Sequence, residues 1–575
     1  MKPESPGSRV RPLRALLCLF VLAGVASPLW AQAPRRPNIL WISNEDMSPH
    51  LGAYGDPVAR TPNLDALAKQ SVRFTSAFTT APVCAPSRAA IIMGMWQNAI
   101  GAQHMRTSFR AIPEIPTPYE VVPPFYVKAF PEYLRAAGYW TSNNFKTDYQ
   151  FGVPFTIWDD IGTKAHWRNR PDRSQPFFAV FNLEVTHESQ TFPDSRARRG
   201  KRLVTDPAKV QVPPYYPDTP KVREELARFY DDIADMDTRV GELLRQLDED
   251  GLADNTIVVY WADHGDGLPR AKRSLYDSGL RVPLMIRWPK GLGPAPFQPG
   301  SVNDQLVSFI DLAPTMLALA GVEIPGHMQG RVLVGPKAGP EPRYVFAARD
   351  RMDGEYDMRR SARDHQYLYI RNFQPELPYV GFLPYRNESD IMQELLRLHA
   401  EGKLTGAPAL WLANHRPAEE LYDVRKDPFQ IHDLSADPAY GAVLARMGQA
   451  VTDWMDRIHD TGLEDESQMV ERMWPGGKQP VTAAPYILER GSKNWRKPVR
   501  DSAQTYSGPT EVEIYEPTQG ASVGYTTESG PHPHWRLYTG PFRLTGPVTI
   551  RAKAIRYGYE ESAETRTTFT PGAPR

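Results

Sequence analysis

The sequence contains few cysteines, with only Cys18 and Cys84 among 575 residues. Cys18 falls in an N-terminal segment with the composition of a cleavable leader, so the mature chain would keep one thiol. A single thiol excludes an intramolecular disulfide as a source of stability. It also suggests that Cys84 has a particular role.

The sequence lacks an excess of charge of either sign, because 67 lysines and arginines balance 67 aspartates and glutamates. Without a basic field, no nucleic-acid partner is predicted. Proline is frequent, at 56 residues, but apolar side chains are plentiful, which indicates ordered loops over a rigid core. A chain of this length exceeds one ordinary domain, and we expect two or three.

Long apolar runs are absent after the N-terminus. There, three arginines precede an apolar run over residues 15–25, and the small-residue sequence Ala31-Gln-Ala33 follows. The run is too short to span a bilayer, and the pattern predicts a signal peptide over residues 1–33. A buried helix is the alternative. We therefore expect an exported protein, periplasmic or secreted, with no stable membrane anchor.

The region that follows alternates between apolar runs and helical patterns. Residues 37–43, 176–183 and 256–261 are continuous apolar runs of strand length, as expected for strands buried on both faces of a parallel sheet. Residues 222–248 place apolar side chains at helical spacing. This alternation predicts an α/β fold with a mostly parallel sheet flanked by helices.

Four regions are expected after the signal peptide. We predict a main domain over residues 36–340, a smaller α+β subdomain over 341–470, and a linker rich in proline, glycine and lysine over 471–505. From about residue 506 the segments alternate in polarity or are β-branched. This sequence pattern predicts a small antiparallel β-sandwich over residues 506–575.

Polar side chains follow two of the predicted buried strands. Glu45 and Asp46 follow the first strand, and Asp263 and His264 follow the strand over 256–261. Open α/β sheets bind ligands at the carboxyl ends of their strands. Two such pairs suit one hard cation with oxygen ligands, whereas each pair alone would be ordinary loop acidity.

Cys84 lies between Pro82 and Pro86, which disfavour helix at the cysteine. We expect Ser87 to cap a helix that follows. This places Cys84 on a loop that leads into a helix N-terminus, where backbone N–H groups favour an anion and Arg88 adds a cation. The alternative is a small cysteine buried beside a helix.

The sequence Cys84-Ala-Pro-Ser-Arg88 resembles the signature of the type I sulfatases. In that family a formylglycine-generating maturation enzyme oxidises the cysteine to Cα-formylglycine, whose hydrated aldehyde is the nucleophile. The resemblance covers residues 37–460 and implies an alkaline-phosphatase-like sheet with a smaller C-terminal subdomain.

Two further resemblances refine this reading. Residues 43–50, 143–149 and 262–265 are similar to the sulfatase branch that contains heparan N-sulfatase (N-sulfoglucosamine sulfohydrolase). Residues 506–575 are similar to the C-terminal β-module of chitobiase-like enzymes, where the role is packing or glycan contact.

The family resemblance also implies the residues of the site. One Ca²⁺ would be held by Glu45, Asp46, Cys84, Asp263 and His264. Glu45 is one methylene longer than the usual aspartate, and His264 offers nitrogen in place of oxygen, so a transition metal is the alternative. The residues implied to act on the sulfate are Cys84, Arg88, Lys146, His187 and Lys272.

In the implied mechanism the formylglycine hydrate attacks sulfur, and His187 protonates the leaving group. Lys146 and Lys272 hold the negative charge. Asp148 stands where many relatives carry a histidine, which leaves the elimination step open between Asp148, His166 and His104. We expect His104 and Asp148 to contact substrate.

The predicted function is hydrolysis of sulfate esters or sulfamates on sulfated glycans such as heparan-type glucosamine. Two alternatives remain from the sequence. One is a phosphonate or phosphate monoester hydrolase of the alkaline phosphatase superfamily. The other is a non-catalytic glycan-binding protein in which Cys84 stays unmodified.

Overall fold

The computed structural model describes residues 36–108, 117–200, 202–492 and 499–572. The predicted signal peptide lies outside the described residues. In the part of the chain that is described, no helix is long and apolar enough to cross a membrane.

The largest sheet has eight strands in the order β5-β4-β6-β1-β7-β8-β2-β9. β1 pairs in parallel with β6 and β7, and β4 extends the parallel part beyond β6, whereas β8 runs antiparallel to β7 and β2. The predicted α/β fold with a mostly parallel sheet is therefore confirmed. The strands are β1 (Asn38–Asn44), β2 (Ser71–Phe74), β4 (Trp140–Asn144), β5 (Asp160–Ile161), β6 (Phe177–Leu183), β7 (Thr256–Ala262), β8 (Leu284–Arg287) and β9 (Val302–Asn303), with β3 (Ala77–Phe78) and β10 (Val307–Ser308) paired separately.

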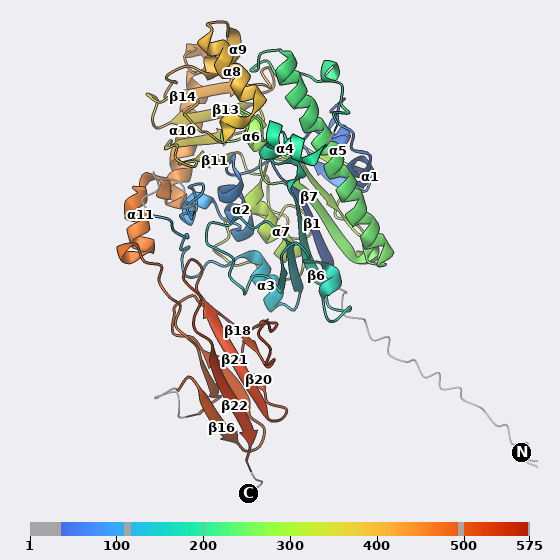
Figure 1. The fold of residues 1–575 in the computed structure, drawn as a ribbon, viewed down its shortest axis with the longest axis vertical. Coiled ribbons are helices and arrows are strands. Elements are labelled where there is room, and N and C mark those ends of the chain that lie inside the picture. Colours follow the sequence, from blue (N-terminus) through green and yellow to red (C-terminus); the bar gives the residue numbers. More distant parts are fainter. Residues whose placement is uncertain (1–35, 109–116, 201, 493–498, 573–575) are drawn as a thin grey trace, which may run out of the picture. The chain divides into compact units, whose positions relative to one another are not determined.

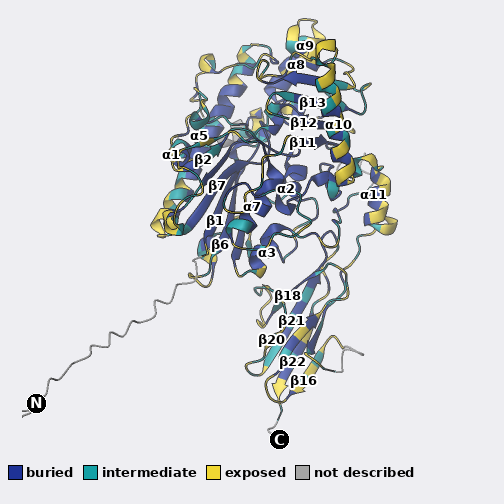
Figure 2. Cartoon of the chain, turned by 180° about the vertical axis from the view of Figure 1, so that it is seen from behind, coloured by how far each residue is buried: buried dark blue, intermediate teal, exposed yellow. Residues whose placement is uncertain are grey.

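Strands β1, β6 and β7 lie between two groups of helices (Figure 1). In one group α1 contacts α5, and in the other α2, α3 and α7 contact one another. The three strands are buried along their whole length, as Figure 2 shows, which explains their continuous apolar sequences. The helices are α1 (Pro62–Ala68), α2 (Cys84–Met93), α3 (Phe130–Ala136), α4 (Pro193–Arg199), α5 (Pro220–Glu249), α6 (Asp277–Leu280) and α7 (Leu312–Leu319).

The smaller subdomain is built on a four-stranded antiparallel sheet in the order β11-β12-β13-β14. Helix α10 packs on β12 and β13, and its Trp454 stacks on Phe346 with ring centroids 5.1 Å apart. The elements are β11 (Val345–Arg349), β12 (Arg359–Arg363), β13 (Tyr367–Asn372), α8 (Asp390–Ala400), α9 (Gly406–Trp411), β14 (Glu419–Asp423), α10 (Gly441–Ile458) and α11 (Glu466–Met473).

The C-terminal β-module has two sheets, β15-β17-β20 and β16-β22-β21-β18-β19. β15 lies inside the segment predicted as a linker and pairs with β17, so the module's strands begin earlier than expected. β16 pairs in parallel with β22, which departs from the predicted purely antiparallel arrangement. The strands are β15 (Tyr486–Glu489), β16 (Ser502–Tyr506), β17 (Glu511–Tyr515), β18 (Ser522–Thr526), β19 (Arg536–Leu537), β20 (Phe542–Arg543), β21 (Val548–Ile555) and β22 (Thr565–Pro571).

Candidate active site

The carboxyl ends of three parallel strands lie level with one another. Asn44, the last residue of β1, is paired with Leu183 of β6 and with Ala262 of β7. The residues that follow each strand are therefore brought to the same edge of the sheet. The predicted site residues in these positions are Glu45, Asp46, His187, Asp263 and His264.

Cys84 is the first residue of α2 and is fully buried. The helix begins three residues earlier than predicted, with Val83 in an extended conformation before it. Pro86 is tolerated because the first turn of a helix needs no N–H donor, so it does not break the helix. Ser87 is not a cap: its hydroxyl donates to the Asp263 carbonyl oxygen (2.6 Å) and joins α2 to the end of β7.

The thiol of Cys84 faces two of the predicted metal ligands. Its sulfur lies 3.5 Å from His264 Nε2 and 3.9 Å from Asp46 Oδ1. His264 Nε2 is also 2.9 Å from Asp46 Oδ1, while its Nδ1 is 3.0 Å from the Gly265 carbonyl oxygen. A hydrogen bond from Nδ1 to that carbonyl leaves Nε2 free to face the site.

Arg88 joins the two acidic pairs. Its guanidinium donates to Glu45, to Asn182 Oδ1 (2.9 Å) and to Asp263 Oδ2 (3.2 Å). Lys146 contacts the other oxygen of Glu45. Burial alone would raise the pKa of Glu45, but Arg88 and Lys146 hold it well below its usual range. Glu45 is therefore a carboxylate at neutral pH.

Asp46 is held by a buried lysine and by the backbone. Lys272 Nζ lies 2.7 Å from Asp46 Oδ2, and the backbone N–H of Glu188 donates to the same oxygen (2.7 Å). Burial opposes ionisation of Asp46, and Lys272 lowers its pKa well below the ordinary value. A side chain at Gly267 would not fit, because a Cβ there would lie 2.9 Å from Asp46 Oδ2.

These side chains fit a single cation. Glu45, Asp46, Cys84 and His187 form one group whose potential ligand atoms lie within 4.8 Å of one another, and Asp46, Cys84, Asp263 and His264 form a second. The two groups share Asp46 and Cys84. Three carboxylates give a donor set rich in oxygen, as hard divalent cations require.

The environment of Cys84 favours a charged sulfur. Burial alone would raise the pKa of the thiol, but Lys146 and Lys272 lower it to about 7. Two lysines thus favour negative charge at position 84.

His187 follows β6 and points its ring at this position. Its Nδ1 lies 2.9 Å from Ser189 Oγ. Burial and Lys272 lower the pKa of His187, but Asp46 and a hydrogen bond with Cys84 raise it above its ordinary value overall. The ring can therefore carry a proton near neutral pH.

Comparison with known proteins identifies the family. The sulfatase family model matches residues 37–322, and that of the chitobiase/beta-hexosaminidase C-terminal domain matches residues 501–567. An ulvan-active sulfatase of Formosa agariphila is 39% identical over 567 residues, covering 92% of this chain and 91% of that protein. The chain belongs to the sulfatase family. The N-sulphoglucosamine sulphohydrolase of Homo sapiens is 26% identical to this sulfatase. That alignment covers 78% of this chain and 94% of the human enzyme.

Solved structures share the fold of this sulfatase. One is a protein in complex with its substrate D-glucosamine-2-N,6-O-disulfate. The superposition covers 75% of this chain and 100% of that protein, with a TM-score of 0.52 and 16% sequence identity. With the family established, the protein is a sulfuric ester hydrolase. This result favours the predicted sulfatase over a phosphonate or phosphate hydrolase and over a non-catalytic glycan-binding protein.

Three residues of the site were not predicted. Glu188 accepts a bidentate pair from Arg273 (2.8 and 2.9 Å) and lies 2.9 Å from Lys272 Nζ. Asn182, near the end of β6, accepts from Arg88. Glu188 and Arg273 directly follow His187 and Lys272 in the sequence, and that adjacency was the available signal.

The structure separates the three candidates for the elimination step. Asp148 Oδ2 lies 3.9 Å from Lys146 Nζ, so Asp148 belongs to the edge of the site. His104 instead contacts Gln103 and Gln150, and burial lowers its pKa to about 4. His166 contacts Gln246. Neither histidine has a partner among the site residues in the described part of this sulfatase.

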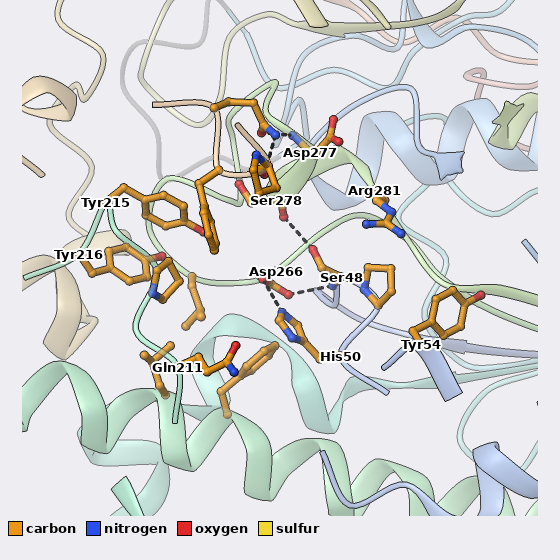
Figure 3. A pocket seen from close by; sticks show the side chains of 18 of the residues that line it. Ser48, His50, Tyr54, Gln211, Tyr215, Tyr216, Asp266, Asp277, Ser278 and Arg281 are labelled. Carbon is orange, nitrogen blue, oxygen red and sulfur yellow. Dashed lines mark hydrogen bonds and ion pairs between the residues drawn. The ribbon is translucent and has the colours of Figure 1, made fainter. Parts of the chain in front are cut away.

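A separate pocket of about 250 Å³ lies beside the loops that carry the site (Figure 3). Asp266 projects into it and accepts from the Ser48 N–H (2.8 Å), while its other oxygen lies 3.0 Å from His50 Nε2. Ser48 Oγ also donates to the Ser278 carbonyl oxygen (2.9 Å). These contacts tie the loop after β1 to the loop after β7 and so fix the two acidic pairs relative to each other.

Proposed function

We propose that this sulfatase hydrolyses sulfate esters or sulfamates of sulfated glycans, with Cys84 converted to formylglycine and one Ca²⁺ bound by Glu45, Asp46, Asp263, His264 and the modified residue at position 84. The observation that carries the proposal is the position of Cys84. Its sulfur lies against Asp46 and His264, at the start of α2, between two lysines that lower the thiol pKa.

Two groups would supply chemistry that ordinary side chains cannot. Formylglycine at position 84 supplies a hydrated aldehyde as the nucleophile toward sulfur. The cation, when bound, supplies Lewis-acid polarisation at the same place. Calcium suits the three carboxylates better than a transition metal does, although His264 would be an unusual ligand for it.

The cationic residues have different tasks. The guanidinium of Arg88 donates to Glu45, Asn182 and Asp263, so we assign it to positioning the metal-binding carboxylates. Lys272 is 2% exposed and Lys146 is 13% exposed, so Lys146 lies on the more open side. Both hold the sulfate as point charges, which stabilises charge that spreads over its oxygens.

Two groups handle protons. Nδ1 of His187 is paired to Ser189 and the ring also hydrogen-bonds Cys84, so Nε2 would hold the proton for the leaving alcohol or amine beside position 84. We assign the second, elimination step to Asp148, because it contacts Lys146 while His104 and His166 lie elsewhere. Asp148 and His104 both remain proposed substrate contacts, with Asp148 beside Lys146 at the edge of the site.

The names of the relatives support a glycan substrate. An ulvan-active sulfatase and an N-sulphoglucosamine sulphohydrolase both match most of the chain. We further propose export after removal of residues 1–33, modification by a formylglycine-generating enzyme, and a division into a main domain over 36–340, a subdomain over 341–470 and a β-module whose strands begin at Tyr486.

Mass spectrometry of the peptide that contains Cys84 tests the proposal. Protein made together with a formylglycine-generating enzyme should show formylglycine at position 84 and hydrolyse 4-nitrophenyl sulfate. Cys84→Ala should be inactive and keep the thermal midpoint of the wild type. A fully active preparation in which Cys84 remains an alkylatable thiol would refute the nucleophile.

A further inference from the structure

The rim of the site is built from two segments that pack on Cys84 itself. Met105 and Met352 form a small apolar cluster with Cys84 and its neighbours Val83 and Ala85. The backbone N–H of Met105 donates to the Arg351 carbonyl oxygen (2.9 Å), which joins the two segments. The next residue of each segment is charged, so Arg106 and Asp353 are carried to the edge of the site.

The guanidinium of Arg106 is available to a ligand. Its side chain is 37% exposed, and its nearest acidic partner is Asp353, with Nε and Oδ1 3.8 Å apart. Among the described residues, no hydrogen-bond partner of this guanidinium is found. Arg273, by contrast, donates two hydrogen bonds to the carboxylate of Glu188. An arginine presents five donors in a planar fork, and those of Arg106 are free.

Arg106 is also held close to the reacting position, because Met105, the residue before it, packs against Cys84. Burial lowers its pKa, whereas Asp148, Cys84 and Asp353 raise it above its ordinary value, so these charges surround the guanidinium. Asp148 Oδ2 is itself buried without a hydrogen-bond partner. The rim thus combines a guanidinium and a carboxylate oxygen that each have an ion-pair neighbour at nearly 4 Å but, among the described residues, no hydrogen bond, beside the proposed sulfate position.

Three residues of the rim share a strained backbone conformation with positive φ. Arg106, Asp148 and Asp353 have φ of 63°, 56° and 52°, a conformation that residues with a Cβ rarely adopt. Asp46 in the site has φ of 51°. Such strain persists where surrounding structure holds a side chain in a required direction, and it concentrates at functional sites.

We propose that Arg106 binds a second anionic group of the substrate, a carboxylate or another sulfate on the saccharide that carries the sulfate to be cleaved. The inference rests on the proposed function and adds a substrate class, namely glycans with more than one anionic group. A planar fork suits both oxyanions through paired, charge-assisted hydrogen bonds. Asp353 competes for the same fork and would be displaced by the ligand.

Kinetics with matched substrates test this role. The substrates compared are 4-nitrophenyl sulfate, a sulfated disaccharide with a uronate carboxylate, the carboxyl-reduced form of that disaccharide, and glucosamine with one or two sulfates. Arg106→Gln should lower kcat/KM about 10- to 100-fold on substrates with the second anion and leave 4-nitrophenyl sulfate unchanged. Loss confined to the uronate identifies a carboxylate, and loss confined to the disulfate identifies a sulfate.

Two further variants separate recognition from structure. Asp353→Asn should raise kcat/KM on the same doubly anionic substrates several-fold, because it removes the competing carboxylate. Arg60→Gln is the matched control: Arg60 is 44% exposed and pairs with Asp231, outside the site, and its loss should change no substrate.

Three results would overturn the inference alone, and a fourth would overturn it together with the proposed function. Equal losses for Arg106→Gln on every substrate would place Arg106 in the reaction itself. No loss on any substrate would remove it from binding, and a loss for Asp353→Asn that matches Arg106→Gln would make the pair structural. A wild type inactive on aryl sulfate and saccharides alike would refute the proposed function, and this inference with it.

Discussion

Two buried clusters of charge in this protein serve different purposes. In the smaller subdomain Arg360 is fully buried with Asp350 and Asp460, at 2.9 and 2.6 Å. Arg360 Nη1 donates to the carbonyl oxygens of Arg349 and Arg359, so all of its donors are used. We call this set the Arg360 cluster.

The active site is equally buried but differently composed. It places Glu45, Asp46 and Asp263 together, around Cys84, with lysines among the cations. The Arg360 cluster sets two carboxylates around one arginine, whereas the site brings three carboxylates together where they could share a metal cation. Burial of charge alone therefore does not identify a site; several carboxylates grouped beside a cysteine at strand ends do.

The largest expected effect comes from removing a shared carboxylate. Asp46→Asn should lower turnover of an aryl sulfate by at least about 10⁴-fold, because Asp46 contacts both the nucleophile position and the proposed metal. Its thermal midpoint should stay within a few degrees of the wild type. Steady-state kinetics and a thermal scan measure both.

Removing the metal provides the control for Asp46→Asn. A chelator should inactivate the wild type, and added Ca²⁺ should restore it. Full activity in protein shown to be metal-free by elemental analysis would contradict the assignment of a cation to this cluster.

The opposite pattern is expected in the Arg360 cluster. Arg360→Met leaves Asp350 and Asp460 buried without a cation, which should cost about 3–5 kcal/mol of unfolding free energy. Urea unfolding measures the loss. Turnover per folded molecule should remain within about twofold, since no member of the cluster is among the proposed site residues. A stable but inactive variant would erase the distinction between the two clusters.

A smaller effect is expected at His187 and should depend on the leaving group. His187→Ala should slow a sulfated saccharide about 10²-fold, because its alcohol needs a proton, and slow an activated aryl sulfate much less. Asp148→Asn should slow both substrates alike if it serves the elimination step. Equal losses for His187→Ala on both substrates, with no effect of Asp148→Asn, would show that these roles are wrongly assigned.

The smallest effect concerns His50, which lies 2.9 Å from Asp56 and 3.0 Å from Asp266. Burial lowers the pKa of His50, but the two carboxylates raise it to about 10, above the ordinary 6.5. This ion pair therefore stabilises the fold fully below pH 6.5 and is lost as pH rises toward 10. His50→Gln should cost on the order of 1 kcal/mol at pH 6 and less at pH 10, by urea unfolding. An equal cost at both pH values would mean that His50 is neutral in the folded state.

The fold was predictable where one physical cause dominates. β1, β6 and β7 are buried on both faces and therefore have continuous apolar sequences. α2 begins at Cys84, before the predicted start, because Pro86 lies in its first turn, where a missing N–H donor costs no hydrogen bond. β15 was not predicted, because the strand forms by pairing with β17, which comes later in the chain, and the local sequence does not record that pairing.

The site was predictable to the extent that strand ends and family resemblance mark it. Glu45, Asp46, Asp263 and His264 follow buried strands, and the structure brings them together. The sequence marked His104 but not Arg106, whose place beside the site depends on the packing of Met105 on Cys84. No local pattern in a sequence records such a contact between distant segments.

The burial of Cys84 has a consequence for timing. No part of this residue reaches the surface of the folded chain. Under the proposed chemistry, a modifying enzyme can reach the thiol only before α2 closes against the sheet. Folding and oxidation are then in kinetic competition, and the active fraction of a preparation records which of the two was faster.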